Sequence, residues 1–148
     1  MEPLSGGTSD FNARVIEEFR ANGGGVGGAL HDTTLILIHH IGAKSGVERV
    51  TPLVCSSQQD GDYLIVASNG GSPSHPSWYH NLTANPRVEV EVGNERFNVL
   101  AQELVGTRRA EEWQKLLAAS PALVDYAAKT TRRIPVLLLT RKINCEVN

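Results

Sequence analysis

A glycine-flanked turn at residues 42–46 carries the clearest chemistry in this sequence. It presents Lys44 and Ser45, and Arg49 follows within a few residues. Two cations, one hydroxyl and a flexible backbone suit the binding of a phosphate or a carboxylate. The spacing does not match the Gly-x-x-x-x-Gly-Lys-Ser/Thr pattern of a nucleotide P-loop. A solvated hairpin tip would use the same residue types, so this segment alone leaves both interpretations open.

A second segment combines small polar residues with large aromatic ones. Residues 66–71 end in Ser-Asn-Gly-Gly, and Trp78 and Tyr79 follow closely. Exposed backbone amides beside a large apolar surface suit a planar cofactor with polar edges. The alternative is that both aromatic residues belong to the hydrophobic core.

Histidines and cysteines do not predict a metal site. His39 and His40 are neighbours in an apolar run that predicts a strand, so their side chains should point to opposite faces. Cys55 and Cys145 are the only cysteines, and their separation indicates neither a disulfide framework nor a zinc knuckle. We therefore expect two ordinary thiols and no bound metal.

The composition indicates one globular domain, residues 1–148. The chain has 41% hydrophobic and 20% charged residues, and its formal net charge is −2. Without a positive field we expect no nucleic-acid partner. The start lacks the pattern of a signal peptide, and no apolar run could span a bilayer. A cytoplasmic location is the default, with peripheral membrane contact left open.

Five basic residues lie near the C-terminus. They could extend a positive field around an anionic ligand, although a solvated face explains them more simply. These residues are Lys129, Arg132, Arg133, Arg141 and Lys142.

Hydrophobic periodicity predicts helices at residues 10–21, after Pro76, around Trp113 and from Pro121 to about Thr130. Strands are predicted at residues 35–41, 49–57, 63–68 and 134–140, with a second hairpin turning at Gly93-Asn94. Alternation in that hairpin predicts that one of its faces meets water. About six mostly antiparallel strands with flanking helices predict an α+β fold whose sheet rolls into a small split β-barrel, about residues 33–141.

In combination these motifs resemble the deazaflavin-dependent nitroreductase family of actinobacteria. The resemblance covers about residues 11–141 in one order. The residues that carry it are Phe19-Arg20-Ala21-Asn22-Gly23-Gly24, Gly42-Ala43-Lys44-Ser45-Gly46, Arg49, Thr51-Pro52-Leu53, Asp60-Gly61, Val66-Ala67-Ser68-Asn69-Gly70-Gly71, Pro76, Trp78-Tyr79-His80-Asn81-Leu82 and Asn85-Pro86.

This resemblance implies a split barrel that binds coenzyme F420, a deazaflavin with a phosphate and an oligoglutamate tail. Lys44 and Arg49 would meet the phosphate and tail, residues 50–54 would run along the deazaflavin, residues 66–69 would border its ring, and residues 77–81 would close the pocket. The implied cofactor-binding residues are Ala43, Lys44, Ser45, Arg49, Val50, Thr51, Pro52, Leu53, Val54, Val66, Ala67, Ser68, Asn69, Ser77, Trp78, Tyr79, His80 and Asn81.

The resemblance also implies an enzyme, an F420H2-dependent reductase that transfers a hydride to an electron-poor small molecule. Activated alkenes, quinones and nitro compounds belong to that class. The family places tyrosines over the cofactor before the last strand, and Tyr126 is the one tyrosine available there, with Ser68 as a second candidate proton donor. Two alternatives remain open at this point: an oxidoreductase that binds flavin mononucleotide on a related barrel, and a noncatalytic deazaflavin carrier.

Overall fold

The computed structural model describes residues 9–23, 34–58 and 61–141. These residues form one seven-stranded sheet in the order β2-β1-β5-β6-β7-β4-β3, and every neighbouring pair is antiparallel. The strands are β1 (Leu35–Ile41), β2 (Glu48–Val54), β3 (Ser56–Ser57), β4 (Tyr63–Val66), β5 (Arg87–Val92), β6 (Glu95–Glu103) and β7 (Val136–Arg141). The helices are α2 (Ser9–Ala21), α3 (Ser77–Ala84), α4 (Gly106–Ala119) and α5 (Pro121–Lys129), with a short 3-10 turn η3 (Asn69–Gly71).

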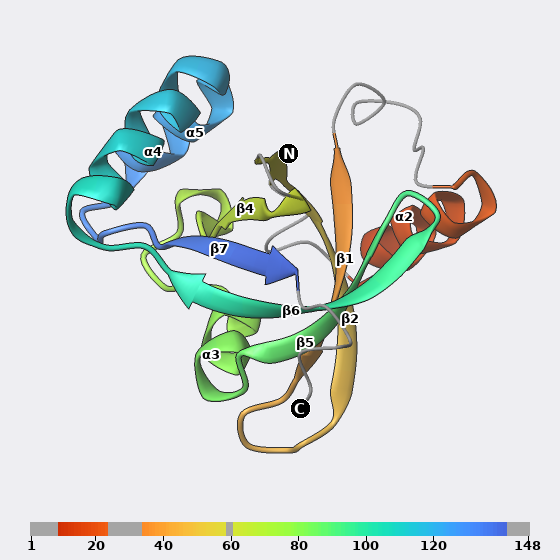
Figure 1. Ribbon diagram of the computed structural model, residues 1–148. Helices are drawn as coiled ribbons and strands as arrows, with labels where there is room; N and C mark the ends of the chain where they lie inside the picture. The colour runs from red at the N-terminus through yellow and green to blue at the C-terminus, as the bar shows by residue number, and fades with distance from the viewer. Residues whose placement is uncertain (1–8, 24–33, 59–60, 142–148) are drawn as a thin grey trace.

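The two edges of the sheet come from one stretch of chain. β2 pairs with β1, whereas β3, which starts two residues after β2 ends, pairs with β4 at the other edge. Cys55 lies between them, and its amide donates to the Thr34 carbonyl over 2.9 Å. A chain that joins both edges so directly requires the sheet to curl, as Figure 1 shows. The expected α+β fold with a rolled antiparallel sheet is confirmed.

The predicted strand at residues 49–57 is wrong in one respect, because it is two strands. The chain changes its partner from β1 to β4 at Cys55, which raises the strand count from six to seven. Hydrophobic pattern alone cannot reveal such a change, since β3 consists of only two serines and both strands are partly buried.

The main core lies inside the curl. Side chains from six strands meet there, and α3 contributes Trp78 and Leu82. On the outer face Leu64 of β4 packs with Leu138 of β7 against α4, while Ile65 points to the inner core, so β4 is covered on both sides as its apolar sequence predicts. No helix in the described part of the chain is long and apolar enough to cross a bilayer.

Helix α2 covers the side of β1 and β5 that faces away from the inner core, where His39 and Glu91 are buried. Val15 and Phe19 pack on Leu35 and Leu37. Beside them Arg20 Nη2 donates to Glu91 Oε2 over 2.6 Å.

Between β1 and β5, the His39 ring joins two carboxylates. Its nitrogens lie 2.6 Å from Glu48 Oε2 and 2.6 Å from Glu91 Oε2. The prediction that this face of the β5–β6 hairpin meets water is therefore wrong at Glu91, which is only 9% exposed. Helix α2 covers it, and sequence alternation cannot show which element will lie on a polar face.

We expect Glu91→Gln to lower the free energy of unfolding by about 3 kcal/mol at pH 7. The hydrogen bond from Arg20, reinforced by His39, lowers the pKa of Glu91 from 4.5 to about 2. A lowered carboxyl pKa stabilises the native state above pH 4.5, and that contribution is lost as the pH falls toward 2. Urea unfolding at pH 7 and at pH 2.5 measures the free energy of unfolding of wild type and variant. The difference between the two proteins should be smaller at pH 2.5.

Glu89→Gln is the matched control on the same strand. Glu89 pairs with Arg96 across the hairpin, with both side chains more than a third exposed, so its loss should cost less than about 1 kcal/mol. Equal destabilisation by the two variants would contradict the proposed role of the buried group.

Candidate cofactor-binding site

The free edge of β2 forms the spine of the candidate site. Among the residues that the structure describes, β1 occupies one edge of β2, and no strand pairs with the other edge. A sheet edge offers backbone amides and carbonyls to a ligand. From Arg49 to Leu53 there are four residue steps, roughly 13 Å at about 3.3 Å per residue. An elongated ligand could therefore contact one strand at two well-separated points.

The register of β2 divides the predicted contacts between two faces. Arg49, Thr51 and Leu53 pair with His40, Ile38 and Ile36, whose face includes the inner core. Val50, Pro52 and Val54 lie on the alternate face, where Val50 packs against the cluster under α2. A ligand can contact residues on both faces of β2 only along the free edge of the strand. The predicted run of contacts at residues 50–54 therefore requires binding at that edge.

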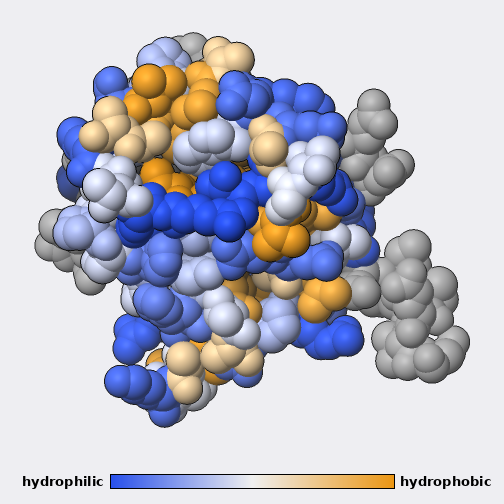
Figure 2. All heavy atoms as spheres, turned by 90° about the vertical axis from the view of Figure 1, so that its left-hand side faces the viewer, coloured by the Kyte–Doolittle hydropathy of each residue, from blue (hydrophilic) through white to orange (hydrophobic). Residues whose placement is uncertain are grey.

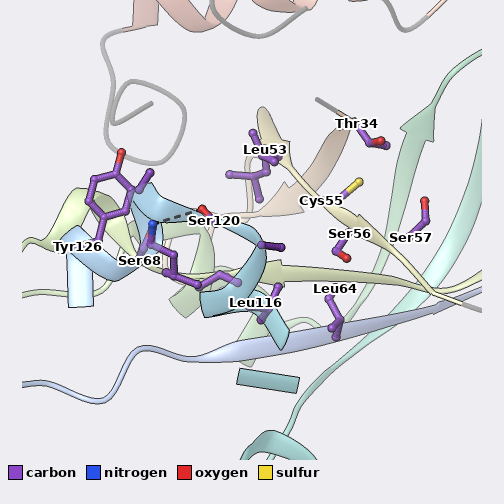
Figure 3. Close-up of a pocket in the computed structure, with 15 residues that line it drawn as sticks. Thr34, Leu53, Cys55, Ser56, Ser57, Leu64, Ser68, Leu116, Ser120 and Tyr126 are labelled. Atoms are coloured by element: carbon purple, nitrogen blue, oxygen red, sulfur yellow. Dashed lines mark hydrogen bonds between the residues drawn. The ribbon is translucent and has the colours of Figure 1, made fainter. Parts of the chain in front are cut away.

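A cavity of about 460 Å³ opens at one end of this edge (Figure 3). It includes five of the predicted site residues, Leu53, Val54, Val66, Ser68 and Tyr126. Its other lining residues are Thr34, Cys55, Ser56, Ser57, Leu64, Leu116, Ala119, Ser120, Ala122 and Leu123. None of the lining side chains is an acid, a lysine, an arginine or a histidine. The cavity suits an uncharged ring system with polar edges.

Helices α4 and α5 form one wall of the cavity, of which the sequence predicted only Tyr126 of α5 as a site residue. Ser120, the residue between them, caps α5 by accepting a hydrogen bond from the Leu123 amide, the dashed line in Figure 3. Viewed from the side of these helices, hydrophobic atoms gather on the upper part of the molecule (Figure 2). Val124 of α5 is an exposed large hydrophobic residue. Helical periodicity predicts both helices but cannot show that they face β2 across a cavity.

Tyr126 and Ser68 line the cavity from different elements. Tyr126 lies on α5, and Ser68 follows β4 and is 8% exposed. The two elements pack closely, because a Cβ on Gly71 would come within 2.9 Å of the Tyr126 carbonyl oxygen. Close packing of η3 against α5 therefore brings Ser68 and Tyr126 to one cavity.

Cys55 also lines the cavity, as a buried free thiol. Burial raises its pKa to about 12, so it remains a neutral thiol. This fits the expectation that Cys55 has no reactive role, while Cys145 lies outside the described residues.

The basic hairpin tip lies at the other end of β2. Lys44, Ser45 and Arg49 are exposed, and Ser45 Oγ accepts a hydrogen bond from the Val47 amide over 3.1 Å. The Ala43 amide donates to Asn81 Oδ1 over 2.9 Å, which joins the tip to α3. In Figure 1 the tip lies at the bottom beside α3, and α4 and α5 lie at the top. The cations and the uncharged cavity are thus separated along one strand.

The predicted wall at residues 77–81 divides into surface and core positions. Ser77 and His80 are exposed, and Tyr79 donates its hydroxyl to Glu103 Oε1 over 2.6 Å. Trp78 is 2% exposed within the core, and Ala67 of the other predicted segment is fully buried. Asn69 directs its side-chain amide to the Ser74 carbonyl. Neither Trp78 nor Ala67 lines the cavity, so the structure places them as support for its walls.

His40 is a buried residue that sequence reasoning did not assign to the site. Its Nε2 lies 2.8 Å from Thr51 Oγ1 and its Nδ1 lies 2.9 Å from Asn81 Nδ2. Burial, together with Arg49 and His39, lowers the pKa of His40 to about 4. His39 contacts the opposite side of the sheet, which confirms that the two rings face apart. Among the described residues, no group of three or more potential metal ligands is close enough to hold an ion.

Two of the five basic residues near the C-terminus are engaged within the protein. Arg132 directs its guanidinium to the carbonyls of Ala67, Ser68 and Ser72 and to His75 Nδ1. Arg141 stacks on the Phe97 ring and pairs with Glu95. These side chains stabilise loops and strands, whereas Lys129 and Arg133 are exposed. Lys142 lies outside the described residues.

The family model described as F420H2-dependent quinone reductase matches residues 13–141. The chain belongs to this family. An F420H2-dependent quinone reductase of Mycobacterium tuberculosis is 44% identical over 111 residues, which cover 72% of this chain and 73% of that protein. The predicted family is confirmed, and with it the prediction of an enzyme that uses reduced coenzyme F420.

Solved structures agree with this assignment. The F420-H2 dependent reductase FDR-A is 42% identical, with a TM-score of 0.63, over 71% of this chain and 92% of that one. A chain described as a domain-swapped dimer is 38% identical, with a TM-score of 0.66, over 88% of this chain and 98% of that one. Both chains are therefore similar to this one in sequence and in fold.

The contact between η3 and α5 is testable through Gly71. Gly71 has a φ of +84°, and Gly71→Ala would add both left-handed strain and a clash with Tyr126 and Lys129. Gly61→Ala is the control, since Gly61 has a φ of +79° but nothing within 4 Å of a Cβ. We expect about 1 kcal/mol of destabilisation for Gly61→Ala and about 2–4 kcal/mol for Gly71→Ala in urea unfolding. Equal losses would show that the packing against α5 contributes nothing.

Proposed function

We propose that this chain transfers a hydride from reduced F420 to an uncharged, electron-poor acceptor, with quinones as the main class and activated alkenes and nitro compounds as further members. The observation that carries the proposal is the separation of charge along β2. An uncharged cavity lies at one end of its free edge and exposed Lys44 and Arg49 lie at the other. A ring with a long anionic tail matches that separation in both charge and length.

Lys44 and Arg49 would hold the phosphate and tail. A hydrogen bond from a charged donor contributes about 1.5–3 kcal/mol, and an exposed cation gains less than a buried one. Ala43 and Ser45 would add a backbone and a hydroxyl contact. The free edge of β2 would meet the deazaflavin between tip and cavity, with Ser77, Tyr79 and His80 at the neighbouring surface of α3.

The cavity would bring the ring and the acceptor together. Bound reduced F420 supplies the hydride, and the protein supplies position and a dry, uncharged environment. Leu53, Leu64 and Leu123 give the cavity apolar walls, and the absence of charge among its lining side chains favours a neutral acceptor. Reduction of a quinone also requires a proton, which the hydroxyl of Tyr126 or of Ser68 would supply, since both residues line the cavity.

Side-by-side fluorescence titrations with F420 and flavin mononucleotide test the cofactor assignment. We expect tighter binding of F420, and a preference that decreases with added salt, because salt screens the contacts to its tail. Stronger binding of flavin mononucleotide would favour the alternative oxidoreductase. Binding of F420 without turnover of quinone, enone or nitroarene would favour a carrier.

The double variant Lys44→Ala/Arg49→Ala should weaken F420 binding about tenfold to a thousandfold, with little change in thermal stability. The matched control is Arg87→Ala/Lys115→Ala, which removes two exposed cations from other elements. Isothermal titration calorimetry measures both. Unchanged affinity in the hairpin variant, or an equal loss in the control, would contradict the assignment of the tail site.

Tyr126→Phe tests the proton donor because it keeps the ring and removes the hydroxyl. If the hydroxyl protonates the acceptor or stabilises a developing oxyanion, kcat should fall by roughly ten- to a thousandfold while the Kd for F420 changes little. Turnover is measured at saturating reduced F420 with a naphthoquinone. Full activity in Tyr126→Phe together with a loss in Ser68→Ala would transfer the role to Ser68.

A further inference from the structure

A chain of hydrogen bonds joins three of the predicted cofactor-binding segments through a residue that belongs to none of them. The Ala43 amide, Asn81, His40 and Thr51 are linked in that order at 2.9, 2.9 and 2.8 Å. His40 and Asn81 are 2% and 8% exposed. Polar side chains as deeply buried as these are stable in a protein interior only when they form hydrogen bonds.

The direction of this chain follows from its first member. A backbone amide can only donate, so Asn81 must present its oxygen to Ala43 and its NH₂ to His40. His40 Nδ1 therefore accepts. A neutral imidazole that accepts at Nδ1 carries its hydrogen on Nε2, and Nε2 faces Thr51 Oγ1. His40 thus donates to Thr51.

The surroundings of His40 keep it in this neutral form. The ring is buried between β1, β2 and α3, and Arg49 and His39 are the charged or titratable groups that disfavour a second proton. A protonated ring would turn an N–H toward the Asn81 amide hydrogens. Geometry and electrostatics therefore agree on one tautomer at neutral pH.

The consequence appears at Thr51. Its oxygen accepts from His40, so the hydroxyl retains its own hydrogen for donation to another group. Thr51 shares a face of β2 with Arg49 two residues earlier, and it is only partly buried. A hydroxyl that donates and a guanidinium on one strand face together suit an anionic oxygen.

We propose that His40 is a positioning residue, which orients Thr51 as a hydrogen-bond donor to the phosphate of F420 and ties the hairpin tip to α3 at the same time. This inference rests on the proposed function. It adds a residue whose role is exerted through Thr51 and Asn81, without contact to the cofactor.

Two substitutions of His40 distinguish its hydrogen bond to Thr51 from its hydrogen bond to Asn81. His40→Gln places an NH₂ near the position of Nε2 and retains donation to Thr51. His40→Asn places an oxygen near Nδ1, accepts from Asn81 and loses Thr51. We expect His40→Asn and Thr51→Val each to weaken F420 binding about ten- to a hundredfold, and His40→Gln and Thr51→Ser to remain close to wild type.

The cycle between His40→Asn and Thr51→Val should be strongly non-additive, because both remove the same donor. A deazaflavin that keeps the ribityl chain but lacks phosphate and tail should bind all variants equally. Fluorescence titration gives these Kd values without turnover. The ¹⁵N spectrum of the cofactor-free protein adds a direct readout, with His40 protonated at Nε2 and unprotonated at Nδ1 at pH 7.

Additive losses, equal losses for the ring without phosphate, or wild-type affinity in Thr51→Val would overturn the role of His40. Wild-type affinity in Thr51→Val would overturn the role of His40 even if His40→Asn does not fold. A wild-type protein that fails to bind F420 would overturn the proposed function itself. Normal wild-type binding with unaffected variants would overturn only this inference.

Discussion

The change of hydrogen-bonding partner at Cys55 is the constraint on which the rest of the structure depends. A single residue, Cys55, separates a strand at one edge of the sheet from a strand at the other, so the sheet must curl until its edges approach. The curl creates the inner core, and it brings the end of β2 opposite β4. Helices α4 and α5 then cover the gap between the edges, and the cavity lies there.

Neighbouring histidines on β1 fasten a helix to each side of the sheet. His39 is joined through Glu91 to Arg20 of α2, and His40 is joined to Asn81 of α3. The alternation of a strand sends two adjacent side chains to opposite faces. Buried polar groups of this kind stabilise only one arrangement of the helices, since a displaced helix would leave them without partners.

The two ends of the candidate site differ in charge. The cavity is lined by apolar and hydroxyl side chains, and the cations lie at the distant hairpin tip. An anionic group bound near the ring would be poorly solvated, whereas at the tip it meets cations and water. In the proposed function, the same strand would therefore specify both where the cofactor binds and in which orientation.

Local elements and the family could be predicted from the sequence alone, because they depend on short-range signals. The β1 strand, the Gly93-Asn94 hairpin and α5 with its Ser120 cap were all identified from periodicity and turn residues. The ordered motifs identified the F420-dependent family, whose model matches residues 13–141. They also placed Leu53, Val54, Val66, Ser68 and Tyr126 in what proved to be one cavity.

Only the tertiary structure decided which residues face one another. Glu91 alternates as a surface residue, yet α2 covers it, and Arg132 resembles a surface cation, yet it binds loop carbonyls about sixty residues away. The helical wall of the cavity and the contacts of His40 likewise join residues far apart in the sequence. Periodicity reports which face of an element is apolar, whereas the partner on that face is chosen by the packing of the whole chain.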